Sequence, residues 1–321
     1  MIFLHEIESK LAVNFKGGYY KDARLYVSIA GDTIISDMSS SLMDIQFYFL
    51  GLEQMIRSRM ELNNLTVLSI NCSIVKYKTD GGSETDDLSL DILYTAGYVK
   101  SYRSLTADDL VGHHFLTGAK SAFLYKGGSY ILNFYLATAE GISIVHHQRD
   151  GLQHGHWIDL SAGLGYQPTN YSADIAKTVI TKGSRSFTVY HMDDTPCETF
   201  SFRNFFNANE IIQLPCSIER NPSTEYETAS VGRVSIPYDV EHKEEFTLRS
   251  APLHTAMADQ LLWMVRSRSV SYMEKKGSAE FLADIIIKDY KIIRSTEPNT
   301  PITFEMTFEY ADTRLPSTLT L

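Results

Sequence analysis

Four of the ten histidines of the chain lie within the stretch HHQRDGLQHGHW. His154 and His156 form an H-x-H pair, and an extended backbone places both imidazoles on the same side. Asp159 follows three residues after the pair. A zinc or iron site could be built from these residues and one of His146 and His147, because imidazole and carboxylate groups bind both metals. Only one of the latter two can take part, since adjacent side chains of a strand point to opposite faces.

The same stretch has a simpler interpretation as the polar, partly exposed end of a β-hairpin with Trp157 packed at its base. The H-x-H pair is similar to that of the cupins, whose jelly-roll fold would suit a strand-rich chain. The cupin pattern also has a glutamate shortly after the pair and a second glycine and proline motif that ends in another histidine. This chain has neither, so we expect a hairpin end without metal ligands.

Two other groups of residues suggest chemistry. His113 and His114 in GHHF would cap backbone carbonyl groups at a helix end and favour its dipole. The segment YHMDDTPCE contains the residue types of a cysteine nucleophile and its base: His191, Asp193, Asp194 and Cys197. Such a pair needs the base within about 3 Å of the sulfur and an oxyanion donor beyond it, which sequence neighbours rarely provide. We expect a solvated loop after the strand SFTVYH.

The common catalytic and phosphate-binding motifs are absent from the sequence. SAGLGYQP contains a Gly-x-Gly, but Gln167 and Pro168 follow where a dinucleotide site needs an opening helix. There is no GxxxxGK[ST], GxSxG or HExxH motif, whereas paired carboxylates could lie anywhere along the chain. We therefore expect no catalytic, cofactor-binding or metal-binding residues, no cofactor and no enzymatic activity.

The composition favours protein or small polar partners. The formal net charge is −10, from 29 basic and 39 acidic residues, which argues against sustained contact with nucleic acid or an anionic membrane. Three scattered cysteines are too few for a disulfide framework and suit a reducing compartment: Cys72, Cys197 and Cys216. The sequence starts without a basic region followed by a long apolar run and has no apolar stretch of membrane-spanning length. We expect no signal peptide and no membrane contact.

Apolar residues recur with the strand period of two. The pattern predicts half-buried strands in LSINCSIVKY, LSLDILY and ITFEMTFEY, with Cys72 as a small core residue. Glycines between apolar runs predict hairpins at Gly31, Gly127 and Gly128, Gly141, Gly183 and Gly277. The polar segments 79–87 and 295–301 are expected to be exposed loops.

Helical periodicity is limited to short segments. TAMADQLLWMVRSR places Met257, Leu261, Met264 and Val265 on one face, with Asp259 in its first turn. Residues 52–62 and 106–115 are weaker candidates, the second beginning with a Thr106 and Asp109 pair that resembles a capping box.

These patterns predict a mainly β chain made of two antiparallel β-sandwich-like domains with one or two short helices. The length of 321 residues exceeds what one core usually supports. Gly, Pro, Ser, Thr and Asn cluster in residues 161–174, so we place an N-terminal β domain with hairpin insertions at 1–165 and a C-terminal domain at 166–321. The patterns do not distinguish a sandwich from a barrel in either half.

The C-terminal half carries a resemblance to a family. FRNFFNANEIIQLPCSIER and YETASVGRVSIPYDVEHKEEFTLRSAPL are followed by ADQLLWMVRSRSVSYM and ITFEMTFEYA. Over roughly residues 200–310 this layout resembles uncharacterised β-rich structural proteins of tailed phages and prophages. There an Arg-Asn pair leads into a strand, then a second strand and a short helix, and an S-x-x-V-x-Y strand, here Ser267 to Tyr272. The family's usual glycine is replaced by Asn207 or Asn209, which can also adopt a left-handed backbone.

The resemblance implies a virion structural protein, such as a phage tail, ring or baseplate-associated component, that is made in the host cytoplasm. Such a protein would assemble into a homo-oligomer and contact neighbouring virion proteins through strand edges and aromatic patches. The 19 tyrosines and the acidic charge suit wet, extensive contacts. Two alternatives are a module that binds carbohydrate or a host surface through the faces of Tyr and Trp157, and a metal-dependent enzyme that uses His154 and His156.

Overall fold

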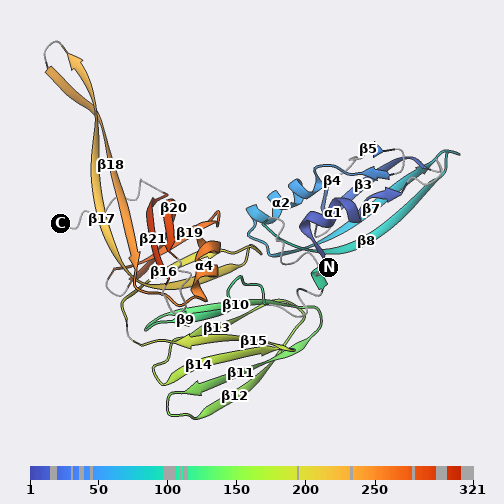
Figure 1. Ribbon diagram of the computed structural model, residues 1–321. Helices are drawn as coiled ribbons and strands as arrows, with labels where there is room; N and C mark the ends of the chain where they lie inside the picture. Colours follow the sequence, from blue (N-terminus) through green and yellow to red (C-terminus); the bar gives the residue numbers. More distant parts are fainter. Residues whose placement is uncertain are drawn as a thin grey trace.

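A computed structural model describes residues 1–14, 20–29, 32–35, 40–43, 46–96, 106–108, 110, 115–193, 195–231, 234–276, 279–293 and 302–311. The fold is mainly β, as the sequence predicts. Its strands form an N-terminal sheet covered by helices, a central two-sheet sandwich and a C-terminal closed barrel (Figure 1). A long hairpin projects from the barrel (Figure 1).

The N-terminal unit is a five-stranded sheet with helices packed against one face. The sheet has the order β1-β8-β7-β3-β4, and a second small sheet has the order β2-β6-β5. Helix α2 buries positions four residues apart, Leu52, Ile56 and Met60, against the alternating apolar residues of the sheet. In chain order the elements are β1 (Ile2–Phe3), η1 (Leu4–Glu6), α1 (Ile7–Lys10), β2 (Val13–Asn14), β3 (Tyr20–Ile29), β4 (Asp32–Ile35), β5 (Ser40–Met43), β6 (Gln46–Tyr48), α2 (Leu52–Leu62), β7 (Val67–Lys78) and β8 (Ser83–Leu93).

The central sandwich packs a five-stranded sheet against a two-stranded one. The larger sheet has the order β12-β11-β14-β15-β9, with β9 parallel to β15, and β10 pairs with β13. Between them lies an apolar core that includes Phe134, Ile144 and Phe187. The strands are β9 (Ser121–Leu124), β10 (Ser129–Leu136), β11 (Glu140–Gln148), β12 (Gln153–Leu160), β13 (Gly163–Asn170), β14 (Ile175–Lys182) and β15 (Arg185–His191).

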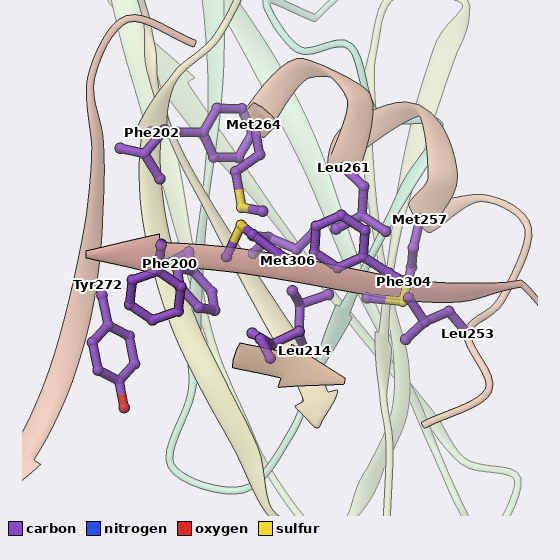
Figure 2. Packing of buried hydrophobic residues seen from close by; sticks show 14 of the residues in the cluster. Phe200, Phe202, Leu214, Leu253, Met257, Leu261, Met264, Tyr272, Phe304 and Met306 are labelled. Carbon is purple, nitrogen blue, oxygen red and sulfur yellow. The ribbon is translucent and has the colours of Figure 1, made fainter. Parts of the chain in front are cut away.

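The C-terminal unit is a six-stranded barrel with the order β16-β17-β18-β21-β20-β19. Helix α4 supplies Met257, Leu261 and Met264 to the barrel core, where they pack with side chains that include Phe304 and Met306 (Figure 2). The barrel therefore has a packed interior, which decides the question that the sequence left open for this half. The elements are β16 (Cys197–Arg203), β17 (Asn209–Val231), β18 (Val234–Ser250), α4 (Met257–Val265), β19 (Val270–Lys276), β20 (Ala279–Ile293) and β21 (Thr303–Tyr310).

Several sequence predictions are confirmed. Strand β21 buries Phe304, Met306 and Phe308, and strand β7 buries Cys72 together with Leu68, Ile70 and Ile74. Helices form at Leu52–Leu62 and Met257–Val265. Gly183 has a φ of +55° and joins β14 to β15 as a hairpin.

Other sequence predictions are wrong. The exposed loop predicted at 79–87 is confined to residues 79–82, because β8 begins at Ser83 and pairs with β7 from there on. Gly127, Gly128 and Gly141 do not mark hairpins, since β9, β10 and β11 pair with other strands. Gly31, Gly277 and residues 295–301 lie outside the described residues, as does much of 106–115, of which 107, 108 and 110 are helical.

The expected domain boundary falls inside a sheet. All of residues 163–170 are paired in register with β10, from Leu136 opposite Gly163 to Ser129 opposite Asn170. Residue 165 is therefore inside the central sandwich, and the packing divides the chain into three units instead of two. Strand β13 escapes the sequence pattern because Gly163, Gly165 and Pro168 interrupt its apolar alternation.

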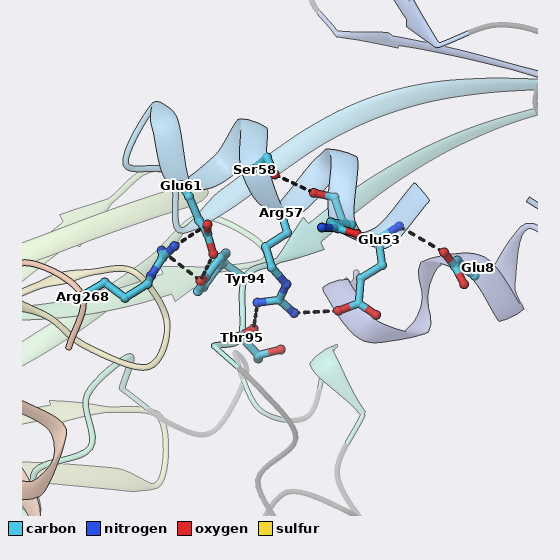
Figure 3. A network of polar contacts seen from close by, with 9 residues as sticks. Glu8, Glu53, Arg57, Ser58, Glu61, Tyr94, Thr95 and Arg268 are labelled. Atoms are coloured by element: carbon cyan, nitrogen blue, oxygen red, sulfur yellow. Dashed lines mark hydrogen bonds and ion pairs between the residues drawn. The ribbon is translucent and has the colours of Figure 1, made fainter. Parts of the chain in front are cut away.

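The N-terminal unit is joined to the barrel by an apolar cluster and by polar contacts. Phe205 and Phe206 of the β16–β17 connection pack with Phe3, Leu93 and Leu116. Arg268 forms an ion pair with Glu61 and hydrogen-bonds to the Tyr94 hydroxyl, which donates to Glu61 over 2.6 Å (Figure 3).

Asn207 adds a second polar link at the same junction. Its φ of +58° is left-handed, in agreement with the sequence argument for this position. The side-chain amide donates to the carbonyl oxygens of Leu65 and Met60 at 3.1 and 3.3 Å. These bonds attach the β16–β17 connection to the end of α2.

Candidate interaction surfaces

The histidine cluster forms part of a hydrogen-bonded chain inside the sandwich. Ser172 donates its backbone N–H to Nδ1 of His191 at 3.0 Å, so a neutral His191 carries its proton on Nε2. Nε2 of His191 and Nδ1 of His146 each lie 3.0 Å from the Thr178 hydroxyl. The consistent assignment is that His191 donates to Thr178 and Thr178 donates to His146.

This arrangement keeps two imidazoles neutral near pH 7. Burial, together with the positive charge that His146 and Arg149 contribute, lowers the pKa of His191 to about 4. Burial also lowers the pKa of His146, and the nearby His156 and His154 add to the effect. The hydrogen bonds from His191 through Thr178 to His146 therefore link β15, β14 and β11 inside the sandwich.

The four-residue metal set that the sequence allows does not converge. His154 lies opposite His146, and the His146 and His156 rings have centroids 5.7 Å apart. Asp159 is on the other face of β12, where it accepts a hydrogen bond from the Trp157 indole at 2.9 Å. Among the residues that the structure describes, no group of three or more His, Cys, Asp or Glu side chains is placed to hold a metal ion.

The cysteine hypothesis receives no geometric support either. His191 is engaged in the chain just described, and Asp193 forms an ion pair with Arg149 at 2.9 Å. Cys197 packs against the barrel core. Burial raises the pKa of Cys72 to about 11 and that of Cys216 to about 12, so both are thiols at neutral pH. Asp194, His113 and His114 lie outside the described residues.

The most prominent surface feature is the projecting hairpin, here called the arm and defined as residues 221–231 and 234–244. Strand β17 pairs with β16 only over Asn209–Pro215, and β18 pairs with β21 only over Glu245–Arg249. Beyond these segments β17 and β18 pair with each other, from Asn221 opposite Glu245 to Val231 opposite Val234. In the described part of the chain no third strand covers the arm (Figure 1).

The arm is acidic and contains two prolines. Residues 221–244 contain five acidic residues against one Arg and one Lys, and proline occurs at positions 222 and 237. The register shifts between Glu227 and Thr228, which marks a bulge. Neither the length of the arm nor its projection was evident from the sequence. Residues 234–240 alternate apolar and polar side chains as a half-buried strand does, and this local pattern does not record which strands pair with β18.

The sandwich has two further open strand edges. Among the described strands, β12 pairs only with β11, and β13 pairs only with β10. Large apolar side chains near these edges are exposed: Leu152, Trp157, Leu164 and Tyr166. Pro168 interrupts β13, whereas β12 has neither a proline nor a lysine to block pairing.

A shallow depression on the open face of the N-terminal sheet is lined by small polar residues, including Asn71, Ser73, Asp87 and Ser89. These groups bond to one another: Ser73 donates to Asp87 at 2.5 Å and Ser89 donates to Asn71 at 2.7 Å. Their pairing gives the depression no evident nucleophile or base.

No protein family model matches the sequence, and a comparison with characterised proteins finds none that is significantly similar. Within the described residues, no helix has the length and apolar character needed to cross a membrane.

Proposed function

We propose that this protein is a non-enzymatic structural component of a phage-like virion, such as a tail, ring or baseplate-associated protein. In this role it assembles with itself and with neighbouring virion proteins. The observation that carries the proposal is the arm, a ribbon whose two halves have no other strand partner within the described residues than each other.

The arm is costly to maintain unless a partner covers it. An isolated two-stranded hairpin is marginally stable in water, and its two outer edges present unpaired backbone N–H and C=O groups. A protein can satisfy these groups by placing the ribbon on the surface of another subunit. In a heterologous contact the same arm then meets the same receiving surface on each successive copy, which generates a ring or a filament.

The resemblance of residues 200–310 to phage structural proteins supports the same role, and the arm lies within that segment. The open edges of β12 and β13 offer additional pairing sites for a neighbouring subunit.

The test is a comparison of the full chain with an arm-shortened variant by light scattering. Asn221 and Glu245 are directly paired, so residues 222–244 can be replaced by Asn-Gly, a two-residue turn that suits a hairpin. We expect a defined oligomer for the full chain and a folded monomer for the variant, with metal content below one atom per chain in both.

Two results would overturn the proposal. One is a full chain that stays monomeric at high concentration and is missing from purified particles. The other is an arm-shortened variant that keeps both its thermal transition and the oligomeric mass of the full chain.

A further inference from the structure

We infer that the outer face of the five-stranded sandwich sheet is a binding site for a neutral oligosaccharide, with the Trp157 indole as its stacking platform. This face is separate from the arm, so the inference does not rest on the proposed assembly role.

The indole of Trp157 is exposed and held in position. Its side chain is 63% exposed, which is unusual for the largest apolar residue type. Nε1 donates to Asp159 at 2.9 Å, and the ring lies over Gly141, where an added Cβ would meet Nε1 at 2.0 Å. One ring face therefore rests on backbone that has no side chain, and the orientation of the indole is fixed before any ligand arrives.

Hydroxyl groups continue from the indole across the sheet. Trp157 lies opposite Ser143, Ser143 opposite Thr181, and Thr181 opposite Ser186. The last two hydroxyls are 2.8 Å apart. With neighbouring strands about 4.8 Å apart, the row extends for about 14 Å, a length comparable to two or three pyranose rings.

The adjoining row on the same face has only small side chains, so the surface is low there. This row consists of Gly155, Val145, Val179 and Thr188, again directly opposite one another. The alternate residues of these strands, such as Ile144 and Ile180, point into the sandwich core. A flat ligand can therefore lie across the sheet beside the hydroxyl row without meeting a large side chain.

The chemistry of the two rows favours a sugar over other ligands. An aromatic face attracts the C–H groups of a pyranose, and Ser and Thr hydroxyls both donate and accept hydrogen bonds, as sugar hydroxyls do. The two rows contain no charged residue, and the group that holds the indole is a carboxylate. An anionic ligand such as a phosphate or a nucleic acid would be repelled by Asp159, and Lys177, the nearest cation that the register places on this face, belongs to the next row beyond the low one.

The test is a titration with soluble hexasaccharides, namely those of cellulose, chitin, xylan, mannan and amylose, followed by isothermal calorimetry and tryptophan fluorescence. A hyaluronan hexasaccharide serves as the anionic comparison. We expect at least one neutral hexasaccharide to bind with a Kd below about 1 mM and to perturb the fluorescence, while the anionic one does not bind.

Variants then assign the binding to this face. Trp157→Ala is expected to weaken binding by at least about tenfold, and Gly141→Ala to weaken it by displacing the indole. Tyr166→Ala, at a residue 67% exposed on β13, is the matched control and should leave the Kd unchanged. Ser143→Ala, an exchange that removes only a hydroxyl, provides a second variant that preserves the fold if Gly141→Ala does not fold.

The inference is overturned if no neutral hexasaccharide binds, if binding survives Trp157→Ala in a folded protein, or if Tyr166→Ala weakens it equally. The arm-shortened variant should bind as the full chain does. That result separates a failure of this inference from a failure of the assembly proposal.

Discussion

Among the residues that the structure describes, Glu210 is the most deeply buried acidic residue, at 1% exposure. Its carboxylate accepts hydrogen bonds at 2.9 Å from Thr117, Asn204 and Gln260, and burial raises its pKa. The three donors come from the segment before β9, the β16–β17 connection and α4, so one carboxyl group holds together parts of two units.

Replacing Glu210 by Ala should therefore destabilise the protein substantially. Three donors would lose their shared acceptor, two of them on the buried side chains of Asn204 and Gln260, and the expected loss in the free energy of unfolding is about 3 kcal/mol. Urea denaturation monitored by circular dichroism measures this loss. Glu53→Ala on the surface of α2 is the control and should cost no more than about 1 kcal/mol. An equal effect of both substitutions would contradict the role assigned to Glu210.

His191 predicts a pH dependence of stability. Its pKa is about 4 in the folded chain, below the value of about 6.5 for an unfolded histidine. Between these values the unfolded state binds more protons, so stability present above pH 6.5 is lost as the pH falls toward 4. The loss approaches about 3 kcal/mol.

Denaturation of the wild type and of His191→Gln at pH 7.0 and 4.5 tests this expectation. The variant should be less stable than the wild type at pH 7.0, because Gln cannot reproduce both imidazole hydrogen bonds, and should show a smaller loss on acidification. His154→Gln, which changes an exposed histidine of the same cluster, should keep the wild-type dependence. Identical pH profiles for wild type and His191→Gln would exclude His191 as the titrating group.

At the scale of elements, helix α4 completes the barrel core. Leu261 is fully buried there, whereas Leu62 at the end of α2 is 80% exposed. The same Leu→Ala change should cost about 3 kcal/mol at position 261 and less than about 0.5 kcal/mol at position 62. Thermal or urea unfolding of the two variants gives the comparison, and a small cost at Leu261 would mean that the barrel core does not depend on α4.

Elements were predictable where one face is buried. Strands β7 and β21 alternate cleanly because one face meets a core and the other meets solvent. The first half of β8 is exposed on both faces. Its sequence is therefore polar without alternation, and a loop was predicted there instead of a strand. The partners of a strand were not predictable, since the turns after β9 and β10 lead to other sheets and nothing local records this.

In the candidate sites too, the features of one strand were predictable and the contacts between strands were not. The sequence placed His146 and His147 on opposite faces of their strand, but Thr178 and His191 come from β14 and β15 and join His146 only through the sheet register. Likewise, the row from Trp157 to Ser186 spans four strands. Pairing between distant segments creates both arrangements, and no spacing within one segment reveals them.

At the scale of the whole molecule, three units are attached to one another while the arm remains uncovered. The contacts around Tyr94 (Figure 3) and the hydrogen bonds of Asn207 attach the N-terminal unit to the barrel. The Glu210 network holds the segment that leads into the sandwich. An anchored body with one free ribbon is the architecture expected of a subunit that reaches a neighbouring copy.

Hydrogen–deuterium exchange of the arm tests this account most directly. Peptides that cover residues 221–244 should exchange rapidly in dilute monomer and become protected as concentration drives assembly, because the neighbouring copy covers their backbone groups. Peptides from the barrel core, such as β21, should remain protected throughout and serve as the internal reference. Arm peptides that exchange equally fast at every concentration, in a sample whose mass by light scattering shows an oligomer, would contradict the claim that the arm is the assembly contact.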